Sequence, residues 1–230
     1  MALQVWLPLN GTLENKGLSN VTVTNHGATV DNNGKIGKCY SFNSNKTISS
    51  TVNISASPIS VSAWVYLTSF HDKWNYIVSL NGSSGYVDTC IGICLESSNK
   101  ICFVAGGNSS LVYTHTESLI GKWTHLVTTF DRNTIKGYVN GNNVCSLSST
   151  AALTRTNFTI GNRYGGDSAL NLNGKVNDVR LYNHCLSPKE VKEISKGLIL
   201  HYKLDGNDIG ITIPRNGGLI PDGVELYDYI

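Results

Sequence analysis

The chain has 230 residues, a formal net charge of +2 at pH 7 and only 15% charged residues. This balance provides no basic stripe for a phosphate backbone and no acidic run, which excludes nucleic acid as an expected partner. The first ten residues lack a positive flank and a long apolar run, so we expect neither a signal peptide nor a membrane-spanning segment there. Asn, Ser and Thr must make the surface polar, which suits hydrogen bonding to neutral sugars.

Short alternating segments separated by turn residues predict an all-β protein. In residues Leu3 to Leu9 the leucines and Val5 share one face of an extended strand, and Trp6 lies on the other face. Further strands are predicted at residues 22–30, 39–42, 60–68, 75–80, 90–95, 101–104, 111–114, 123–131, 136–139, 157–160 and 174–182. Residues 140–142, Asn-Gly-Asn, tolerate the positive φ of a tight hairpin turn. Strands at this spacing are typical of a two-sheet antiparallel sandwich.

One short helix is predicted after the last strand. Ser187 is a capping residue, Pro188 suits the first helical position, and Glu190 completes a capping box. The helix should run to about Lys196 and end at Gly197, with an apolar stripe that packs on the sandwich.

Four segments carry a resemblance to a known family. They are residues 34–42, residues 59–67, residues 121–141 with Gly-Lys-Trp-Thr-His at their start and Tyr-Val-Asn-Gly at their end, and residues 172–187. In this order they resemble the signature strands of the laminin-G-like, concanavalin A-like lectin/glucanase jelly-roll family. The resemblance covers most of residues 3–196 and implies a jelly-roll sandwich. Lectins, glycosidases and plain interaction modules all use such a sandwich, so the fold alone does not decide the function.

The sequence predicts one domain over residues 1–196 and a C-terminal extension over residues 197–230. Residues 198–206 repeat the pattern of residues 3–11, which resembles the first strand of a following module. The residues that remain are too few for a second sandwich. We therefore interpret the extension as a truncated module or an extended attachment tail, whose last residues could pair with the edge strand of a neighbour.

The six cysteines are interpreted as free thiols of a chain made in a reducing cytosol. Cys39 and Cys185 stand where the resembled family has a small apolar residue, and a free cysteine packs as one. Cys90, Cys94 and Cys102 have the even spacing that could place them on one face of adjacent strands. No Cys-x-x-Cys pair or histidine-rich cluster accompanies them, so zinc is not expected.

The sequence lacks the motifs of the common hydrolases. It contains no Glu-x-Asp-x-x-Glu string on a strand, no Gly-x-Ser-x-Gly elbow and no His-Glu-x-x-His helix. The resemblance implies that His125 is a structural histidine of its strand. We therefore expect the chain not to be an enzyme.

Carbohydrate binding requires an exposed aromatic face with amides or carboxylates close by. Three loops and one strand face offer such groups. The candidates are His71, Asp72, Trp74 and Asn75 in the first loop, Asn81 and Tyr86 in the second, Arg163, Tyr164 and Asp167 in the third, and Trp6 on the strand face. In an alternative interpretation, Trp74 packs on the edge of the sandwich. The sequence does not say whether the loops converge.

The resemblance also implies a possible Ca²⁺ ion that orders a loop at the rim, held by carboxylate and carbonyl oxygens. The candidate ligands are Asp31, Asp167 and Asp178. In the alternative interpretation, Asp178 is a buried hydrogen-bonding partner of neighbouring strands. No other cofactor is expected.

The favoured hypothesis is a non-catalytic carbohydrate-binding or adhesion module. The resemblance is to phage and prophage tail-fibre or decoration proteins, which implies a virion protein that meets bacterial-surface or mucosal glycans after lysis. The alternatives are a purely structural virion protein attached to other subunits through its tail, and a glycoside hydrolase with an unrecognised site. The sequence leaves open the glycan, the host, and whether the chain forms a homo-oligomer.

Overall fold

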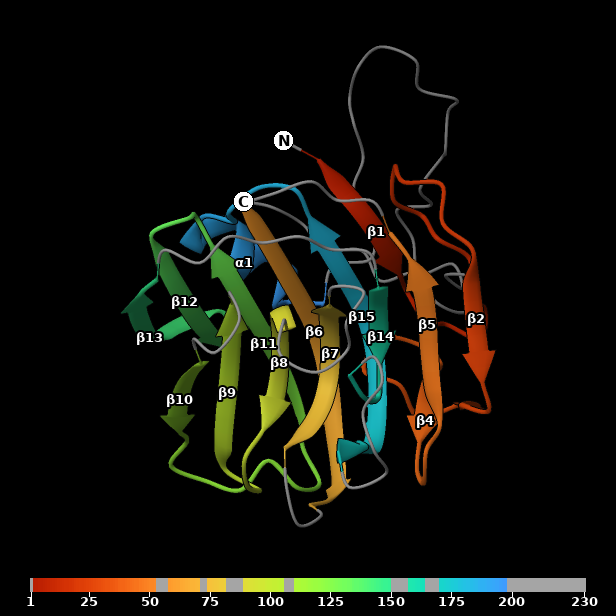
Figure 1. The fold of residues 1–230 in the computed structure, drawn as a ribbon. Coiled ribbons are helices and arrows are strands. Elements are labelled where there is room, and N and C mark those ends of the chain that lie inside the picture. The colour runs from red at the N-terminus through yellow and green to blue at the C-terminus, as the bar shows by residue number, and fades with distance from the viewer. Residues whose placement is uncertain are drawn as a thin grey trace, which may run out of the picture.

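The computed structural model describes residues 2–52, 58–70, 74–81, 89–105, 110–149, 157–163 and 170–197, without the side chains of residues 89, 90 and 110. They form two antiparallel sheets packed face to face and one short helix (Figure 1). This arrangement confirms the predicted all-β sandwich. In the described part of the chain, no helix is long and apolar enough to cross a membrane. Residues 198–230 lie outside the described residues, so the interpretation of the extension stays a prediction.

The eight-stranded sheet is called sheet A. Its strands are β1 (Leu3–Leu7), β3 (Thr29–Asp31), β4 (Cys39–Phe42), β6 (Ile59–Ser69), β11 (Trp123–Phe130), β12 (Thr134–Val139), β13 (Asn142–Ser148) and β15 (Asn173–Tyr182). Their order is β13-β12-β11-β6-β15-β4-β3, and β1 pairs with β15 as well.

The seven-stranded sheet is called sheet B. Its strands are β2 (Val23–His26), β5 (Thr47–Thr51), β7 (Asn75–Asn81), β8 (Thr89–Leu95), β9 (Lys100–Ala105), β10 (Ser110–Thr114) and β14 (Asn157–Ile160). Their order is β10-β9-β8-β7-β14-β5-β2, so the chain crosses repeatedly between the two sheets.

The main hydrophobic core lies between the sheets and follows from the alternation of side chains along each strand. In β6, the odd-numbered residues from Ile59 to Leu67 are buried in this core, which places Trp64 and Tyr66 on the outer face of sheet A. Gly137 of β12 allows a close approach of the two sheets, because a Cβ there would overlap the Phe103 ring of β9.

One predicted strand is in fact two. The prediction of a single strand over residues 22–30 was wrong, because β2 ends at His26 in sheet B and β3 begins at Thr29 in sheet A. Gly27 has φ +91°, and the Asn25 side chain makes two hydrogen bonds to the backbone of Ala28. This local turn carries the chain from one sheet to the other.

The predicted strands also omitted β5 and β13. β5 contains a single apolar residue, Ile48, and β13 is a largely exposed edge strand, so neither shows a strong alternating pattern. The tight turn before β13 was predicted correctly, since Asn140 and Gly141 both have positive φ, at 48° and 82°. Two positive φ values in succession match the twist of a hairpin.

Helix α1 (Pro188–Ile194) confirms the capping prediction. The Ser187 side chain accepts a hydrogen bond from the Glu190 N–H, and the Glu190 carboxylate accepts one from the Ser187 N–H. The helix ends at Ile194, one short turn before the predicted Lys196. Val191 is fully buried against the outer face of sheet A, so α1 covers part of that face at the upper end of the sandwich in Figure 1.

His125 of β11 is buried on the outer face of sheet A, with 1% of its surface exposed. Its ring lies 5.1 Å from that of Trp64, its cross-strand partner on β6. Burial, together with the nearby charge of Arg180, lowers the pKa of His125 from 6.5 to about 3. The imidazole is therefore neutral at neutral pH and inaccessible from the surface, which agrees with a structural role.

Replacing Gly137 with Ala should destabilise the sandwich by about 1–3 kcal/mol, because the added methyl group forces Phe103 or the strand to shift. Urea unfolding would measure this change. The control is Lys136→Ala, a half-buried residue on the opposite face of the same strand, which should change the stability by less than about 0.5 kcal/mol. Equal effects of the two substitutions would contradict the close approach of the sheets.

The protein should lose stability in acid through His125. The unfolded chain takes up a proton on this residue below pH 6.5, whereas the folded chain does so only near pH 3. Stability therefore falls with decreasing pH by up to about 1.4 kcal/mol per pH unit in that window. Urea unfolding at several pH values should show a smaller acid loss in His125→Gln. The same change at the exposed His26 should leave the loss intact, and an unaltered loss in His125→Gln would contradict the assignment.

Candidate functional site

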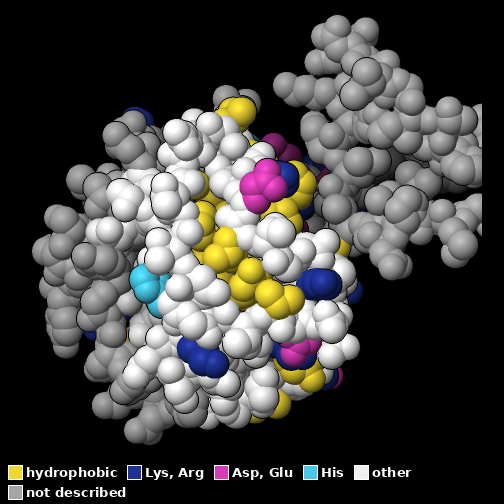
Figure 2. Space-filling view, turned by 90° about the vertical axis from the view of Figure 1, so that its right-hand side faces the viewer, with side chains coloured by type: hydrophobic (Ala, Val, Ile, Leu, Met, Phe, Trp, Pro, Cys, Tyr) yellow, Lys and Arg dark blue, Asp and Glu magenta, His cyan; other side chains and the backbone are white. Residues whose placement is uncertain are grey.

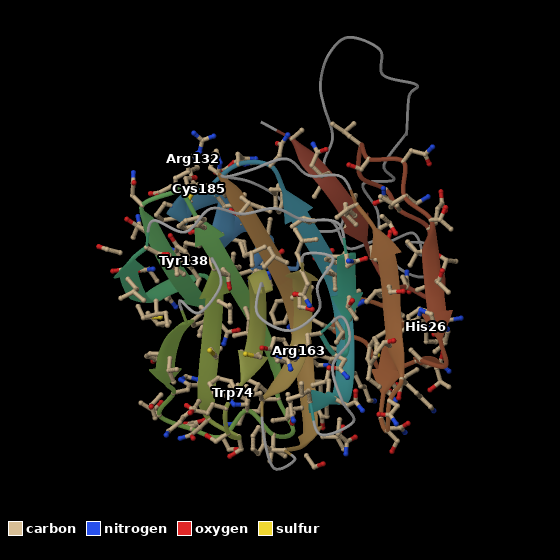
Figure 3. The ribbon with its side chains drawn as sticks, in the orientation of Figure 1. His26, Trp74, Arg132, Tyr138, Arg163 and Cys185 are labelled. Carbon is tan, nitrogen blue, oxygen red and sulfur yellow. The ribbon has the colours of Figure 1, made fainter. Side chains whose placement is uncertain are left out.

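Three aromatic and cationic side chains meet on the outer face of sheet B. Trp74, immediately before β7, is half-buried and packs on a small hydrophobic cluster separate from the main core. The buried members of this cluster are Tyr76, Cys94, Cys102, Val104 and Leu170. The Arg163 guanidinium lies over the Tyr76 ring, 5.9 Å from its centroid. Figure 3 shows Trp74 and Arg163 in the same lower central part of the sandwich, although they come from distant segments.

Trp74 has a backbone conformation that is rare for a bulky residue. Its φ is +25°, in a region that side chains with a Cβ seldom adopt. The next residue, Asn75, is fully buried and pairs with Leu95 of β8, so the strand fixes the chain directly after Trp74. Strain of this kind persists only where the surroundings hold it, and it is concentrated at ligand-binding positions.

A ladder of side-chain amides, formed by the buried Asn162 and Asn171 and the exposed Asn45, holds Arg163 beside β7. The Asn171 Nδ2 group donates to Asn45 Oδ1 at 2.6 Å, and the Asn162 Nδ2 group donates to Asn171 Oδ1. Asn162 Oδ1 in turn accepts the backbone N–H of Arg163 at 2.7 Å. The Ser79 hydroxyl of β7 donates to the Asn162 carbonyl at 3.1 Å. These bonds connect three separate chain segments and fix the position from which Arg163 reaches Tyr76.

Gly161 permits the turn that leads to this ladder. It has φ +88°, and a Cβ at this position would overlap the Phe42 ring. Its N–H donates to the Ile77 carbonyl at 3.0 Å, and its carbonyl accepts the Leu172 N–H at 2.9 Å. The turn that follows β14 is therefore hydrogen-bonded to β7 through Ile77 and to the segment before β15 through Leu172.

The structure brings together two of the predicted sugar-binding residues, Trp74 and Arg163. Asn75 and Asn81 were predicted in exposed loops, which was wrong: both belong to β7 and are 0% and 2% exposed. Their amides are enclosed by the pairing of β7 with its neighbours. The other loop candidates lie outside the described residues; they are His71, Asp72, Tyr86, Tyr164 and Asp167.

Trp6 lies on the opposite sheet from Trp74. It belongs to β1 of sheet A, where its Nε1–H donates to Asp178 Oδ1 at 2.7 Å. The Arg180 guanidinium lies over its ring, 4.9 Å from the centroid. The main core separates Trp6 from Trp74, so the structure does not bring it into the same site.

The two described aspartates from the predicted calcium ligands are each paired with a cation. Asp31 lies 2.8 Å from the Lys175 ammonium, and this hydrogen bond is the main cause that lowers the Asp31 pKa. Asp178 is 3% exposed and accepts a hydrogen bond from Arg180 Nε at 2.9 Å, which supports the alternative interpretation. Among the described residues, no group of three or more His, Cys, Asp or Glu side chains could hold a metal ion. These two residues therefore do not fit a hard cation, which prefers several oxygen ligands.

The sequence interpretation missed Tyr76. This residue lies in the predicted strand over residues 75–80 and was not named as a candidate, yet it belongs to the cluster on which Trp74 packs and lies under the Arg163 guanidinium. A signal was present, because residues two apart on an extended chain lie on the same face. Trp123 is half-buried beside Tyr66 on the outer face of sheet A, with 5.7 Å between the ring centroids.

The surface of the sandwich carries few charges. Figure 2 shows the side on which β2 lies, where uncharged polar side chains and backbone cover most of the area. A short band of hydrophobic side chains and scattered charged groups interrupt this cover. This composition agrees with the expectation of a neutral polar surface.

Replacing Asn171 with Ala should remove the central rung of the amide ladder. The buried Asn162 amide would lose its bond to Asn171, which should cost about 1–3 kcal/mol in stability. Urea unfolding checks this cost. Asn173→Ala is the matched control, because Asn173 is half-buried and bonds Ser69 away from the ladder. A loss for Asn171→Ala no larger than that of the control would contradict the role of the ladder.

Comparisons with known proteins agree with this fold. Domain 4 of AbnA, a GH43 extracellular arabinanase from Geobacillus stearothermophilus, was solved in complex with arabinotriose; it is 20% identical, with a TM-score of 0.62 over 84% of this chain and 98% of that chain. The binding domain of Paraclostridial Mosquitocidal Protein 1 is 15% identical, with a TM-score of 0.68 over 85% of this chain and 52% of that one. The receptor-binding domain of botulinum neurotoxin type G is 16% identical, with a TM-score of 0.65 over 85% of this chain and 51% of that one.

The chain thus spans nearly all of the arabinanase domain and about half of the toxin binding domains. At these identities the likeness shows the fold alone. A search of curated proteins found no match. A family model described as the concanavalin A-like lectin/glucanases superfamily matches residues 41–192, which is more than half of the sequence. The chain therefore belongs to the concanavalin A-like lectin/glucanase superfamily.

Proposed function

We propose that the chain is a non-catalytic carbohydrate-binding module whose binding surface is the outer face of sheet B around Trp74, Tyr76 and Arg163. The observation that carries the proposal is a shared cluster: Trp74 packs on the hydrophobic cluster that contains Tyr76, and the Arg163 guanidinium lies over the Tyr76 ring. An aromatic face binds the apolar side of a sugar ring, and a guanidinium donates hydrogen bonds to its hydroxyl groups. The strained backbone at Trp74 supports a ligand-binding role for this position.

The composition of sheet B supports binding without hydrolysis. Its seven strands contain no Asp or Glu residue, whereas most glycosidases need two carboxyl groups about 5–10 Å apart beside the scissile bond. The only charged residue in these strands is Lys100 at the start of β9, with Arg163 beside β7 and the single carboxylate of Glu96 directly after β8. Such a surface can hold a sugar, but these strands supply neither a general acid nor a nucleophile.

The similar structures support the same class of ligand. The arabinanase domain was solved with arabinotriose, and the toxin domains are named as binding or receptor-binding domains. We therefore propose an oligosaccharide of a cell-surface or secreted polysaccharide as the ligand. Its identity depends on the loops at residues 71–73, 82–88 and 164–169, which adjoin the site in sequence and lie outside the described residues.

The association with a phage or prophage virion rests on the sequence resemblance and stays a proposal. The alternative, a structural protein attached through residues 197–230, is likewise a proposal, because the described residues end at Gly197. Mass spectrometry of purified particles would test the virion assignment. A copy of the chain lacking residues 198–230 would test the attachment role, which predicts loss of incorporation without loss of glycan binding.

Trp74→Ala should weaken binding to any glycan that the chain recognises by about tenfold or more, because a stacked aromatic ring contributes on the order of 1.5 kcal/mol. The measurement is a glycan-array screen of a multivalent form that includes arabinan oligosaccharides, followed by titration of single hits. Trp123→Ala is the matched control, since it removes a half-buried tryptophan from the opposite sheet.

Two outcomes would overturn the proposal. One is equal loss of binding in Trp74→Ala and Trp123→Ala when both variants are folded, which would place the site elsewhere. The other is the release of reducing ends from a bound oligosaccharide by the wild-type chain, which would show that the module is catalytic. Absence of binding across the array would favour the structural role.

A further inference from the structure

Two buried cysteines face each other beneath Trp74. Cys94 of β8 and Cys102 of β9 are directly opposite in the antiparallel register of these strands. Both side chains are completely buried, and they share a hydrogen bond with each other. In the structure both are reduced thiols.

The register suits a covalent bond between the two sulfur atoms. Directly opposed residues of an antiparallel pair have Cα atoms about 4.5–5.5 Å apart, which lies inside the range of about 4.4–6.8 Å that a disulfide spans. The two side chains already lie on the same face of sheet B and in the same cluster. A bond between them therefore requires side-chain rotation and no change of strand pairing.

We propose that Cys94 and Cys102 form a cross-strand disulfide when the chain folds in a medium that contains a small-molecule disulfide such as oxidised glutathione. One cysteine thiolate attacks the oxidant, which forms a mixed disulfide and releases one glutathione thiolate. The second cysteine thiolate attacks the protein sulfur of that mixed disulfide and releases the other glutathione. The protein dithiol loses two electrons and two protons, and the oxidant is reduced to two molecules of glutathione.

The burial of the pair determines when the bond can form. The hydrogen bond that the Cys94 thiol shares with Cys102 and the loss of solvent both raise the pKa of Cys94. Exchange requires a thiolate that the oxidant can reach, so the folded chain should react slowly and the folding chain quickly. Once formed, the bond would be enclosed by the cluster and protected from reducing thiols.

The other described cysteines lack this arrangement. Cys39 lies on β4, near one edge of sheet A, and Cys145 lies on β13, at the opposite edge. Burial raises the pKa of each to about 11. In the described strand pairings, Cys94 and Cys102 are the two cysteines that directly oppose each other. The disulfide would also cross-link β8 and β9 within the cluster on which Trp74 packs. Tyr76 of the same cluster is the cross-strand partner of Cys94 on β7.

The test is to refold the full chain from denaturant in a mixture of reduced and oxidised glutathione and to map its peptides with trypsin without reduction. Cleavage after Lys73, Lys100 and Lys122 separates the two cysteines. The expected product is a linkage between peptides 74–100 and 101–122, with the mass of two hydrogen atoms lost. Because Cys90 shares the first peptide, the linkage should persist in Cys90→Ser and disappear in Cys94→Ser.

Several results would overturn the inference. Cys102 recovered as a free thiol, capped by glutathione or linked to a cysteine other than Cys94 would each do so. The state of Cys102 is measured in the refolded wild-type chain, so the test does not depend on whether a variant folds. The oxidised chain should also unfold at a higher urea concentration than the same chain after reduction. An equal or lower midpoint would show that the native register does not accommodate the bond.

Discussion

The close packing of the two inner faces is the constraint on which the rest of the molecule depends. Buried side chains from both sheets fill the space between them, and Gly137 leaves room for the Phe103 ring of the facing sheet. Because residues alternate along each strand, filling the inner face also fixes which residues lie outside. The positions of Tyr76 on sheet B and of Trp64 on sheet A therefore follow from the core.

The outer faces then acquire different characters. Sheet A carries polar and charged groups that are paired among themselves, such as Asp178 with Trp6 and Arg180, and Asp31 with Lys175. Helix α1 covers a further part of this face. Sheet B has strands without carboxylates and an aromatic cluster with one guanidinium over it. An aromatic surface with few charged groups is suited to a neutral sugar, and this contrast is why we propose the site on sheet B.

The proposed site obtains its precision from hydrogen bonds deeper in the molecule. In the amide ladder from Asn45 through Asn171 to Asn162, the buried Asn171 and Asn162 amides bond to each other, and Asn171 also bonds to the exposed Asn45. A buried amide without a partner costs free energy, so these segments have a strong preference for one arrangement. Arg163 is attached directly to the end of this ladder. Arg163, which we propose as a ligand contact, is therefore positioned by this hydrogen-bonded ladder.

Local patterns in the sequence determined the class of fold. The alternation of apolar residues predicted most strands, the Ser187 capping box predicted α1, and the turn at Asn140 and Gly141 predicted the hairpin. Each of these signals acts between residues a few positions apart, so it can be read without knowing the fold. Trp74 and Arg163 were likewise recognised from their local surroundings as candidate sugar contacts.

Only the tertiary structure decided which segments meet. The split of residues 22–30 between two sheets, the burial of Asn75 and Asn81, and the contact of Arg163 with Tyr76 all depend on pairing between distant strands. The pairing of β5 and β13 is of the same kind, because a polar strand is held by its neighbours rather than by its own apolar pattern. The sequence by itself thus determined the strands, the helix and the type of surface. The arrangement of the site was set by the core, since the burial of apolar side chains is a property of the whole chain and not of any one segment.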